Sequence, residues 1–578
     1  MERFPTWTFF TAVVLLTLTP RPAAQNANQQ NSPPDNPPSR VARISYLSGK
    51  VSFLRAGLNQ WSQAALNFPA TTGDRIYTDV ESRAELEVGP YTVRLAGSTD
   101  LTITSLTDQM FQLGIQQGTI RMSVYELRPN QTIEVDTPNG ALTVGDRGKY
   151  RIQTDANGDH TFVVVDSGTL TITDGSFSQQ IDAGQAVRLT GENPVQVESI
   201  PMPLRDAFDA WSDNRDLQRT QAESANYVSS STPGYSDLDE YGHWQQAEDY
   251  GPVWYPVVPA GWIPYRFGHW VWIDPWGWTW MEDEPWGFCP FHFGRWVLIA
   301  GVWGWLPGPI VPFPVYAPAF VGFLGGPGFS IGIGVDLVGW FPLGPRDPFF
   351  PWYHYGGDYL RLVNVTNVRN VTNIINIINV RDINEVHYAY QKIAATAVPK
   401  NVFSSGQPVA HNTVHLNPSQ LAKAQIVPHP AVNPTRAAAL PGKPVPVPPT
   451  RQQALRTANR AGAGAVKPGA ANGRVERNAP PPESTRPLAA ERMPGGTRAP
   501  ALHPLVTRRA PPLPPVPFAE RAPAMRAHPG RPLEPLQVEE LRAGRPVGPM
   551  RDMEFPPHPI AIAPVRPVRP APHARPPR

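Results

Sequence analysis

Apolar and polar residues alternate in short runs along residues 41–200. One run carries Ala84, Leu86 and Val88, and comparable runs recur up to residue 172. Because side chains of a strand point alternately to opposite faces, each run predicts a strand with one face in a core. Turn signals such as Gly73-Asp74 separate the runs. The pattern predicts an antiparallel β domain, a sandwich or a short coil of sheet, over residues 41–200.

The motifs of this region resemble the FecR domain, a β-rich extracytoplasmic module of bacteria. The matching segments are Gly49-Lys50-Val51, Gly73-Asp74-Arg75-Ile76-Tyr77-Thr78, Ser82-Arg83-Ala84-Glu85-Leu86, Gly118-Thr119-Ile120-Arg121, Val135-Asp136-Thr137-Pro138 and Ala183-Gly184-Gln185. Signalling members of the family carry a cytoplasmic helical segment and a membrane helix before this domain. Here the strands almost directly follow an expected leader, so the iron-citrate signalling role of the namesake is not expected.

Residues 1–24 have the features of a secretory signal peptide. Arg3 precedes a mostly apolar run, Phe4 to Leu18, and small residues follow at Ala23 and Ala24. A single N-terminal anchor helix is the alternative, although the run is short for a membrane span. We expect an extracytoplasmic protein (periplasm, cell envelope or secreted), with a disordered spacer over residues 25–40.

Residues 201–232 predict a linking helix. Leu204, Phe208 and Trp211 stand at i, i+4 and i+7 among charged residues, which is typical of an amphipathic helix. We expect it to connect two β domains through this apolar face; a partner-binding helix is the alternative.

Tryptophan is concentrated in one stretch, with 12 of the 17 tryptophans between Trp244 and Trp305. The string Tyr241-Gly242-His243-Trp244 recurs 26 residues later at 267–270, and again after 26 residues as Phe293-Gly294-Arg295-Trp296. Each unit predicts two short strands and a Gly/Pro turn, such as Gly268 to Ile273 followed by Trp278 to Trp280. We therefore expect a Trp-rich β-repeat domain over residues 233–406, with Trp270 and Trp272 on one face.

This region resembles an uncharacterised Trp/Tyr/Gly-rich domain family of secreted bacterial proteins that often follows FecR-like domains. The resemblance rests on the runs Gly234 to Trp244, Ala260 to Arg266, Asp283 to Gly287 and Gly339 to Pro345. It implies a domain boundary near residue 235 and an end near residue 400. The family brings no known activity with it.

Indoles packed in a repeat predict a core, because each ring buries a large area. The functional alternative is a surface platform that stacks on sugar rings or binds a partner. Its candidate residues are Trp254, Trp262, Trp270, Trp272, Trp278, Trp280 and Trp296. Nucleic-acid binding is disfavoured, because Arg266 and Arg295 are outnumbered by three acidic residues at 282–284.

An enzymatic interpretation would use Glu282, Asp283 or Glu284 with His269 or His292. Adjacent residues of a strand point to opposite faces, so these carboxylates do not predict an opposed acid–base pair. His243 and His269 occupy one repeat position, which explains them better than a metal site does. We predict no catalytic residue, no metal and no cofactor, and we expect the one cysteine, Cys289, to be a buried thiol.

The uncharged stretch 297–335 contains too many Pro and Gly residues to predict a membrane helix. Between Asn364 and Asn379, asparagine recurs every third residue among β-branched residues, which favours an extended segment paired within the fold; a self-association strand is the alternative. From Gln407 to residue 578 we expect a disordered tail, since residues 401–578 hold 38 of the 71 prolines and no Trp or Tyr.

The same residues carry 24 Lys/Arg against 9 Asp/Glu, net +15, so the tail could contact anionic envelope surfaces. Taken together, the sequence predicts a secreted, non-enzymatic envelope protein that binds or scaffolds, with a cell-wall glycan or another envelope protein as partner. A trans-acting envelope sensor that contacts a membrane protein through the FecR-like domain is the alternative. A glycan hydrolase is a more distant one.

Overall fold

Strands fill the region where apolar residues alternate. The computed structural model describes residues 36–331, 334–368, 386–448 and 503–550. The strands of the β domain, residues 41–200, are β1 (Ala42–Ser48), β2 (Val51–Leu54), β3 (Trp61–Gln63), β4 (Pro69–Ala70), β5 (Arg75–Thr78), β6 (Arg83–Val88), β7 (Tyr91–Leu95), β8 (Asp100–Leu106), β9 (Met110–Val124), β10 (Thr132–Thr137), β11 (Gly140–Val144), β12 (Gly148–Thr154), β13 (His160–Ser167), β14 (Thr169–Asp174), β15 (Phe177–Asp182), β16 (Gln185–Thr190) and β17 (Gln196–Ile200). The mostly β fold class predicted from the sequence is confirmed.

The long strand β9 belongs to two sheet layers. Its second half pairs with β7 and β12, in a layer that continues through β13, β16 and β17. Its first half pairs with β8 and, in parallel, with β10, and this layer continues through β11, β14 and β15. The predicted apolar runs face one shared core, in which Leu86, Val93 and Met122 are fully buried.

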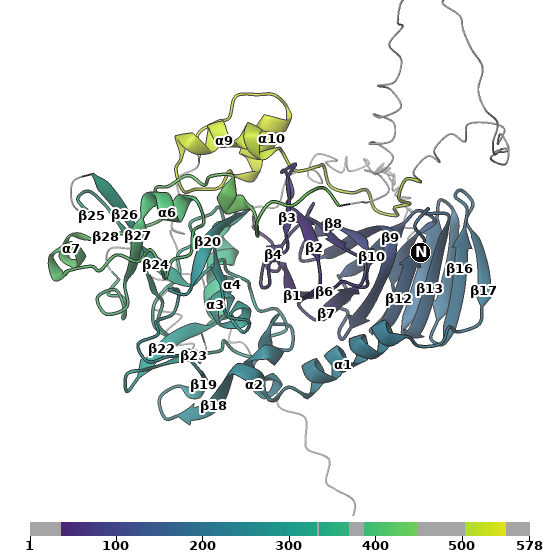
Figure 1. The fold of residues 1–578 in the computed structure, drawn as a ribbon, viewed down its shortest axis with the longest axis horizontal. Helices are drawn as coiled ribbons and strands as arrows, with labels where there is room; N and C mark the ends of the chain where they lie inside the picture. The colour runs from purple at the N-terminus through teal and green to yellow at the C-terminus, as the bar shows by residue number, and fades with distance from the viewer. Residues whose placement is uncertain (1–35, 332–333, 369–385, 449–502, 551–578) are drawn as a thin grey trace, which may run out of the picture. The chain divides into compact units, whose positions relative to one another are not determined.

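The linking segment forms α1 (Ala207–Gln221), the 3₁₀ turns η1 (Glu223–Asn226) and η2 (Tyr235–Asp237), and α2 (Leu238–Tyr241). Asp206 caps α1 by accepting the backbone N–H groups of Phe208 and Asp209. The predicted apolar face of this helix is confirmed for Phe208, which is buried, and for Trp211, whose ring lies 5.1 Å from that of Tyr46 in β1, but it is wrong for Leu204, which precedes the helix and is 95% exposed. The helix also buries polar residues against the β domain, namely Asp209, Ser212, Asp216 and Arg219. Figure 1 shows α1 running across the strands from near β13 toward α2.

The three tryptophan repeats are three hairpins. They are β18 (Gly242–Ala247) with β19 (Gly251–Pro256), β20 (Gly268–Ile273) with β21 (Gly277–Glu282), and β22 (Arg295–Ile299) with β23 (Val302–Leu306); α3 (Phe288–His292) precedes the third. The predicted hairpin at 268–280 is confirmed. In it Trp270 opposes Trp280 and Trp272 opposes Trp278, both with ring centroids 5.4 Å apart.

A glycine at or just before the first strand of each repeat is required by the paired strand and its indole. A Cβ on Gly268 would lie 2.1 Å from the carbonyl oxygen of Met281 and 2.8 Å from Cζ2 of Trp280, and one on Gly242 would lie 2.4 Å from the carbonyl oxygen of Tyr255 and 2.5 Å from Cε2 of Trp254. The third repeat is the same, with Gly294 under Trp305. The Gly-x-Trp spacing therefore lets one indole lie flat across the neighbouring backbone.

The remaining elements surround the hairpins. They are β24 (Val321–Gly325), β25 (Ser330–Ile331), β26 (Val335–Pro342), α4 (Gly357–Val365), β27 (Thr396–Pro399), α6 (Lys400–Ser404), α7 (Pro418–Lys423), β28 (Gln425–Val427), η4 (Ala437–Ala439), α9 (Phe518–Ala527) and α10 (Pro535–Arg542). Asn364 was expected in an extended segment but lies in α4, where its buried amide donates to the carbonyl oxygens of Phe349 and Leu360. The ladder from Asn370 to Asn379 lies outside the described residues.

Residues 407–448 and 503–550 were expected to belong to a disordered tail, but in the structure they are folded. These stretches carry α7, β28, α9 and α10 and pack on the folded chain, because buried residues such as Val516 and Met525 interrupt the proline-rich sequence. The rest of the tail, the signal peptide and spacer residues 25–35 lie outside the described residues. Within the described part of the chain, no helix is long and apolar enough to cross a membrane.

Candidate functional site

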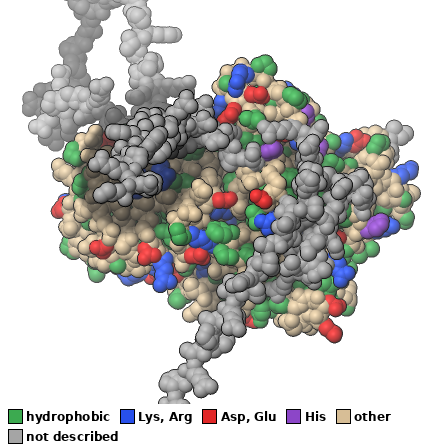
Figure 2. All heavy atoms as spheres, turned by 180° about the vertical axis from the view of Figure 1, so that it is seen from behind, with side chains coloured by type: hydrophobic (Ala, Val, Ile, Leu, Met, Phe, Trp, Pro, Cys, Tyr) green, Lys and Arg blue, Asp and Glu red, His purple; other side chains and the backbone are tan. Residues whose placement is uncertain are grey.

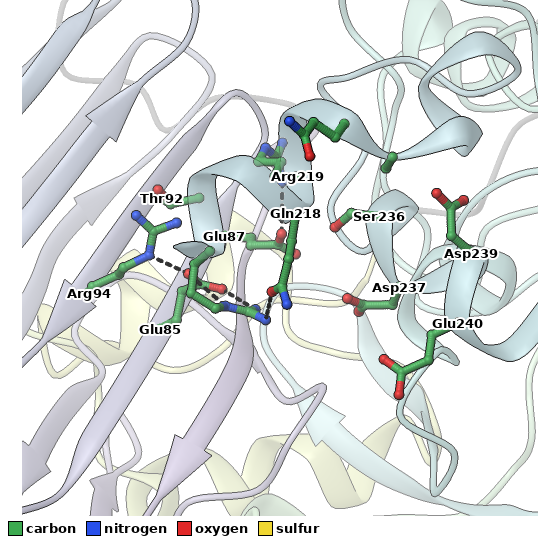
Figure 3. A pocket seen from close by; sticks show the side chains of 13 residues that line it. Glu85, Glu87, Thr92, Arg94, Gln218, Arg219, Ser236, Asp237, Asp239 and Glu240 are labelled. Atoms are coloured by element: carbon green, nitrogen blue, oxygen red, sulfur yellow. Dashed lines mark hydrogen bonds and ion pairs between the residues drawn. The ribbon is translucent and has the colours of Figure 1, made fainter. Parts of the chain in front are cut away.

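A polar cavity of about 290 Å³ lies where α1, the β domain and the start of the Trp-rich region meet. We call it the junction cavity; Figure 3 shows strand residues on one side, α1 above and α2 on the other side. Its lining residues are Glu85, Glu87, Thr92, Arg94, Arg215, Gln218, Arg219, Gln221, Ala222, Ser236, Asp237, Asp239 and Glu240. The lining residues that belong to β6 and β7 alternate along these strands with residues of the core. They therefore point to the opposite face of the sheet, which is the face that α1 covers.

Arg43 joins the β domain to the Trp-rich region. Its guanidinium is 1% exposed and donates to Glu87 at 2.9 Å, to the Asp237 carboxylate, and to the carbonyl oxygen of Pro285 at 3.1 Å. Glu87 also accepts from Arg219 at 2.8 Å and from the backbone N–H of Gly234 at 2.9 Å. One buried cation thus bridges β6 to residues 237 and 285 beyond the linking helix.

A second cluster fixes α1 to the sheet. Arg94 and Arg215 donate to Glu85 at 2.5 and 2.6 Å. Burial by itself raises the pKa of Glu85, but the two guanidinium charges outweigh it and lower that pKa to about 2. Arg94 also donates to Asp216 of α1 at 2.6 Å, and the pKa of Asp216 is lowered, against the effect of burial, by Arg94 and Lys149.

Farther along α1 the same pattern continues. Arg121 of β9 pairs with Asp209 at 2.5 Å, and Arg151 of β12 pairs with Asp206 and Asp209 at 2.8 Å. Buried ion pairs add little net stability, because desolvation offsets the attraction, but removing one partner leaves an uncompensated buried charge. Charge matching therefore fixes the register of the helix, in addition to the apolar contacts of Phe208 and Trp211.

The mouth of the junction cavity is acidic. Asp239, Glu240, Gln218 and Gln221 are exposed there, whereas Glu85, Glu87 and Arg94 are buried in the floor. The Asp239 carboxylate also accepts the backbone N–H of Ser224 at 3.0 Å, which fixes its position. Positioned carboxylates at the rim of a polar cavity suit a ligand with an ammonium or guanidinium group. On the face drawn in Figure 2, basic and acidic side chains are interspersed.

The seven indoles proposed as a stacking platform are all in the core. The exposed fraction of these side chains is 6% for Trp262 and at most 1% for the others. The ring pairs Trp270–Trp280 and Trp272–Trp278 meet edge to face, whereas Trp262 and Trp296 pack at a tilt. The platform interpretation is wrong for these seven, because a buried ring offers no face to a sugar. Core packing, the other interpretation of the repeat, is confirmed. Several indole N–H groups bond to backbone oxygens; Trp254, for example, donates to Leu238 at 3.0 Å.

Acrylamide quenching of tryptophan fluorescence tests this burial. Among the described indoles, only Trp211 and Trp244 are partly exposed. We expect the quenching constant of the native protein to be several-fold below that of the urea-unfolded protein, and a Trp211→Phe/Trp244→Phe variant to lose most of the remaining quenching. Native quenching close to the unfolded value would contradict a buried repeat.

Of the residues of the enzymatic alternative, His269 and Asp283 come together, with Nδ1 of His269 3.6 Å from Oδ1 of Asp283. Glu282 is 5% exposed and accepts from the Trp280 N–H at 2.8 Å, and burial raises its pKa well above the ordinary value, whereas Asp283 and Glu284 are exposed. Among the described residues, no group of three His, Cys, Asp or Glu side chains could hold a metal ion. Cys289 is buried as predicted, and burial raises the pKa of its thiol.

His292 gives a pH-dependent prediction. Burial, with a smaller contribution from the charge of Arg43, lowers its pKa from 6.5 to about 4. Between pH 6.5 and pH 4, His292 therefore binds a proton in the unfolded chain but not in the folded chain. Protonation of the unfolded chain lowers the free energy of unfolding, so the protein is at its full stability above pH 6.5 and loses stability as the pH falls toward 4. We expect a loss of roughly 3 kcal/mol in the free energy of unfolding over that window from this group.

Urea titrations between pH 7 and 4 check this expectation. A His292→Phe variant should lose that part of the pH dependence while keeping the part that comes from carboxylates. An unchanged slope in the variant would show that His292 titrates normally.

A family model described as a family of unknown function (DUF6600) matches residues 235–347, which is the part predicted to resemble a Trp-rich family. No curated protein matches the chain. Two crystal structures of a candidate anti-sigma factor from Parabacteroides distasonis are similar to it at 12% identity and a TM-score of 0.20. One match covers 22% of this chain and 60% of that chain, the other 32% and 99%. At this TM-score the likeness carries no argument about fold or function.

The sequence did not predict the junction cavity. No role was predicted for its strand residues, although a signal was present: Asp209, Ser212, Asp216 and Arg219 recur at helical spacing along one side of α1. Basic residues at 94, 121 and 151 alternate with core residues in three neighbouring strands. Matching a polar helical stripe to a charged sheet face would have found the contact.

Proposed function

We propose that the protein is an extracytoplasmic, non-enzymatic binding module whose ligand is a basic side chain of another envelope protein, received in the junction cavity. The observation that carries this proposal is the cavity itself. Both regions of the chain build it, buried ion pairs hold its floor, and Asp239 and Glu240 form an acidic rim. A preorganised polar site loses little conformational entropy when a ligand binds.

A non-enzymatic role is supported by the chemistry of the remaining candidates. The Glu282 carboxyl is buried and accepts a hydrogen bond from the Trp280 indole N–H. Localisation outside the cytoplasm is part of the proposal and rests on the leader sequence and on the resemblance of the β domain to FecR modules. Direct binding of cell-wall glycan through the indoles is not part of it.

The second candidate function is that of a trans-acting envelope sensor. The bridge from Glu87 through Arg43 to Asp237 favours it, since a partner at the cavity would touch the β domain and the Trp-rich region together. Such a contact could transmit a change in one region to the other.

Site-specific photocrosslinking in the producing cells tests the proposal. A photoreactive amino acid at Gln218, on the rim, should give one discrete crosslinked protein, and the band should be lost in an Asp239→Asn/Glu240→Gln background. The same amino acid at Gln180, exposed on β15, is the matched control and should give no such band. Crosslinks only to peptidoglycan, or a band unaffected by the two rim substitutions, would refute the proposal.

A further inference from the structure

A stretch of the proline-rich tail lies against the outer face of the β domain, far from the junction cavity. Residues 503–521, here called the tail strap, begin at His503, which contacts Asp159 and Glu192, and end at Arg521, which pairs with Asp274. Near its start, the backbone N–H of Val506 donates to the carbonyl oxygen of Thr137 at 2.9 Å.

The strap is held mainly through its backbone. Oε1 of Glu134 accepts the N–H groups of both Arg508 and Arg509, each at 3.1 Å, and Gln112 donates to the carbonyl oxygen of Arg509 at 3.0 Å. The side chains of Arg508 and Arg509 are exposed. The contact therefore involves two consecutive backbone N–H groups and is independent of the side chains of those two residues.

The surface under the strap is shaped for it. Gln112 and Gly114 of β9 lie beside Glu134 and Asp136 of β10 in the parallel register, on the face opposite the core. A Cβ on Gly114 would come within 2.7 Å of Cδ1 of Leu505, so the Leu505 side chain packs directly over the glycine. We call these four residues the strap groove.

The acid pair of the groove is buried and shares a proton. Glu134 and Asp136 are at most 1% exposed, and Gln112 also donates to Asp136 at 2.9 Å. Burial, together with the charge of Glu134 and a hydrogen bond to it, raises the pKa of Asp136 to about 8, so Asp136 keeps its proton at neutral pH and Glu134 carries the negative charge. The groove is thus a built polar site whose charged acceptor, Glu134, meets the N–H groups of the strap.

We infer that the strap groove is a peptide-binding site for an extended segment with two consecutive free backbone N–H groups followed by a proline-rich run. The chain's own residues 503–517 are its resident ligand, and a partner segment of the same chemistry binds by displacing them. This site shares no residue with the junction cavity, so either proposal can fail without the other.

Peptide binding to full-length variants tests the inference. Arg508→Pro/Arg509→Pro removes the two N–H donors from the resident strap, while Arg508→Ala/Arg509→Ala keeps them and is the matched control. The probe is a fluorescently labelled peptide with the sequence of residues 503–521. We expect the proline variant to bind it at least tenfold more tightly than the wild type or the alanine variant, because only there is the groove vacant.

Adding Glu134→Ala to the proline variant should abolish peptide binding, with an unchanged circular dichroism spectrum showing that the fold is retained. If Glu134→Ala unfolds the protein, a second probe peptide serves as the test instead. This peptide carries proline in place of both Arg508 and Arg509, and it should not bind to the proline variant. The inference would be overturned if the wild type and the proline variant bound the peptide equally well, or if the alanine variant bound it as tightly as the proline variant. Peptide binding that does not depend on Glu134 or on the two N–H groups would also overturn it.

Discussion

Replacing Arg43 with alanine is expected to destabilise the protein by about 3–5 kcal/mol. The substitution leaves the Asp237 carboxylate without its guanidinium partner, and it removes one of the two guanidinium partners of Glu87. The site is buried, since Arg43 is 1% exposed. The carbonyl oxygen of Pro285 and the amide oxygen of Asn67 lose a donor as well. Equilibrium urea unfolding gives the change in free energy directly.

Arg188→Ala is the matched control for this prediction. Arg188 also pairs with a glutamate, Glu198, but both side chains are exposed, so the loss should stay below about 1 kcal/mol. If Arg43→Ala cost no more than Arg188→Ala, the bridge between the two regions would contribute nothing to the fold.

Trp270→Ala is expected to cost about 3–5 kcal/mol, because it removes the ring at the centre of the aromatic core. Trp270 is 1% exposed and contacts five rings, those of Trp280, Phe323, Trp340, Trp352 and Phe403. The cavity left behind is lined by rigid side chains that cannot collapse into it. Thermal or urea unfolding measures the loss.

A control for the hairpin position is Val302→Ala. Val302 also lies in a repeat hairpin but is 55% exposed, so its truncation should change stability by less than about 0.5 kcal/mol. A Trp270→Ala variant as stable as Val302→Ala would mean that the repeat does not form the packed core described here.

Alternation and repeat spacing were sufficient to predict the local structure. Strands at 84–88 and 91–95 and the hairpin around Trp270 follow from periods of two and from Gly/Pro turns, which are local signals. Burial of the indoles was also predictable, since a repeat of 26 residues cannot bury large rings except against its neighbours.

The junction cavity could not be predicted in the same way. Arg43, Glu87 and Asp237 are separated by up to 194 residues, and a charged residue in an alternating strand looks the same whether water or a helix covers it. The helix was predicted only in part for this reason: Phe208 and Trp211 do pack inward, but the polar contacts of Asp209 and Asp216 with the sheet were not predicted. The strap likewise depends on Glu134, which accepts backbone groups 374 residues away.

The central claim is that the β domain and the Trp-rich region form one cooperative unit through the Arg43 bridge, with the binding site built between them. Pulsed hydrogen exchange read by mass spectrometry along a urea titration follows both parts at once. Peptides from residues 41–200 and from 235–347 should lose protection at the same urea concentration in the wild type and at different concentrations in Arg43→Ala. Two separate transitions in the wild type would contradict the account.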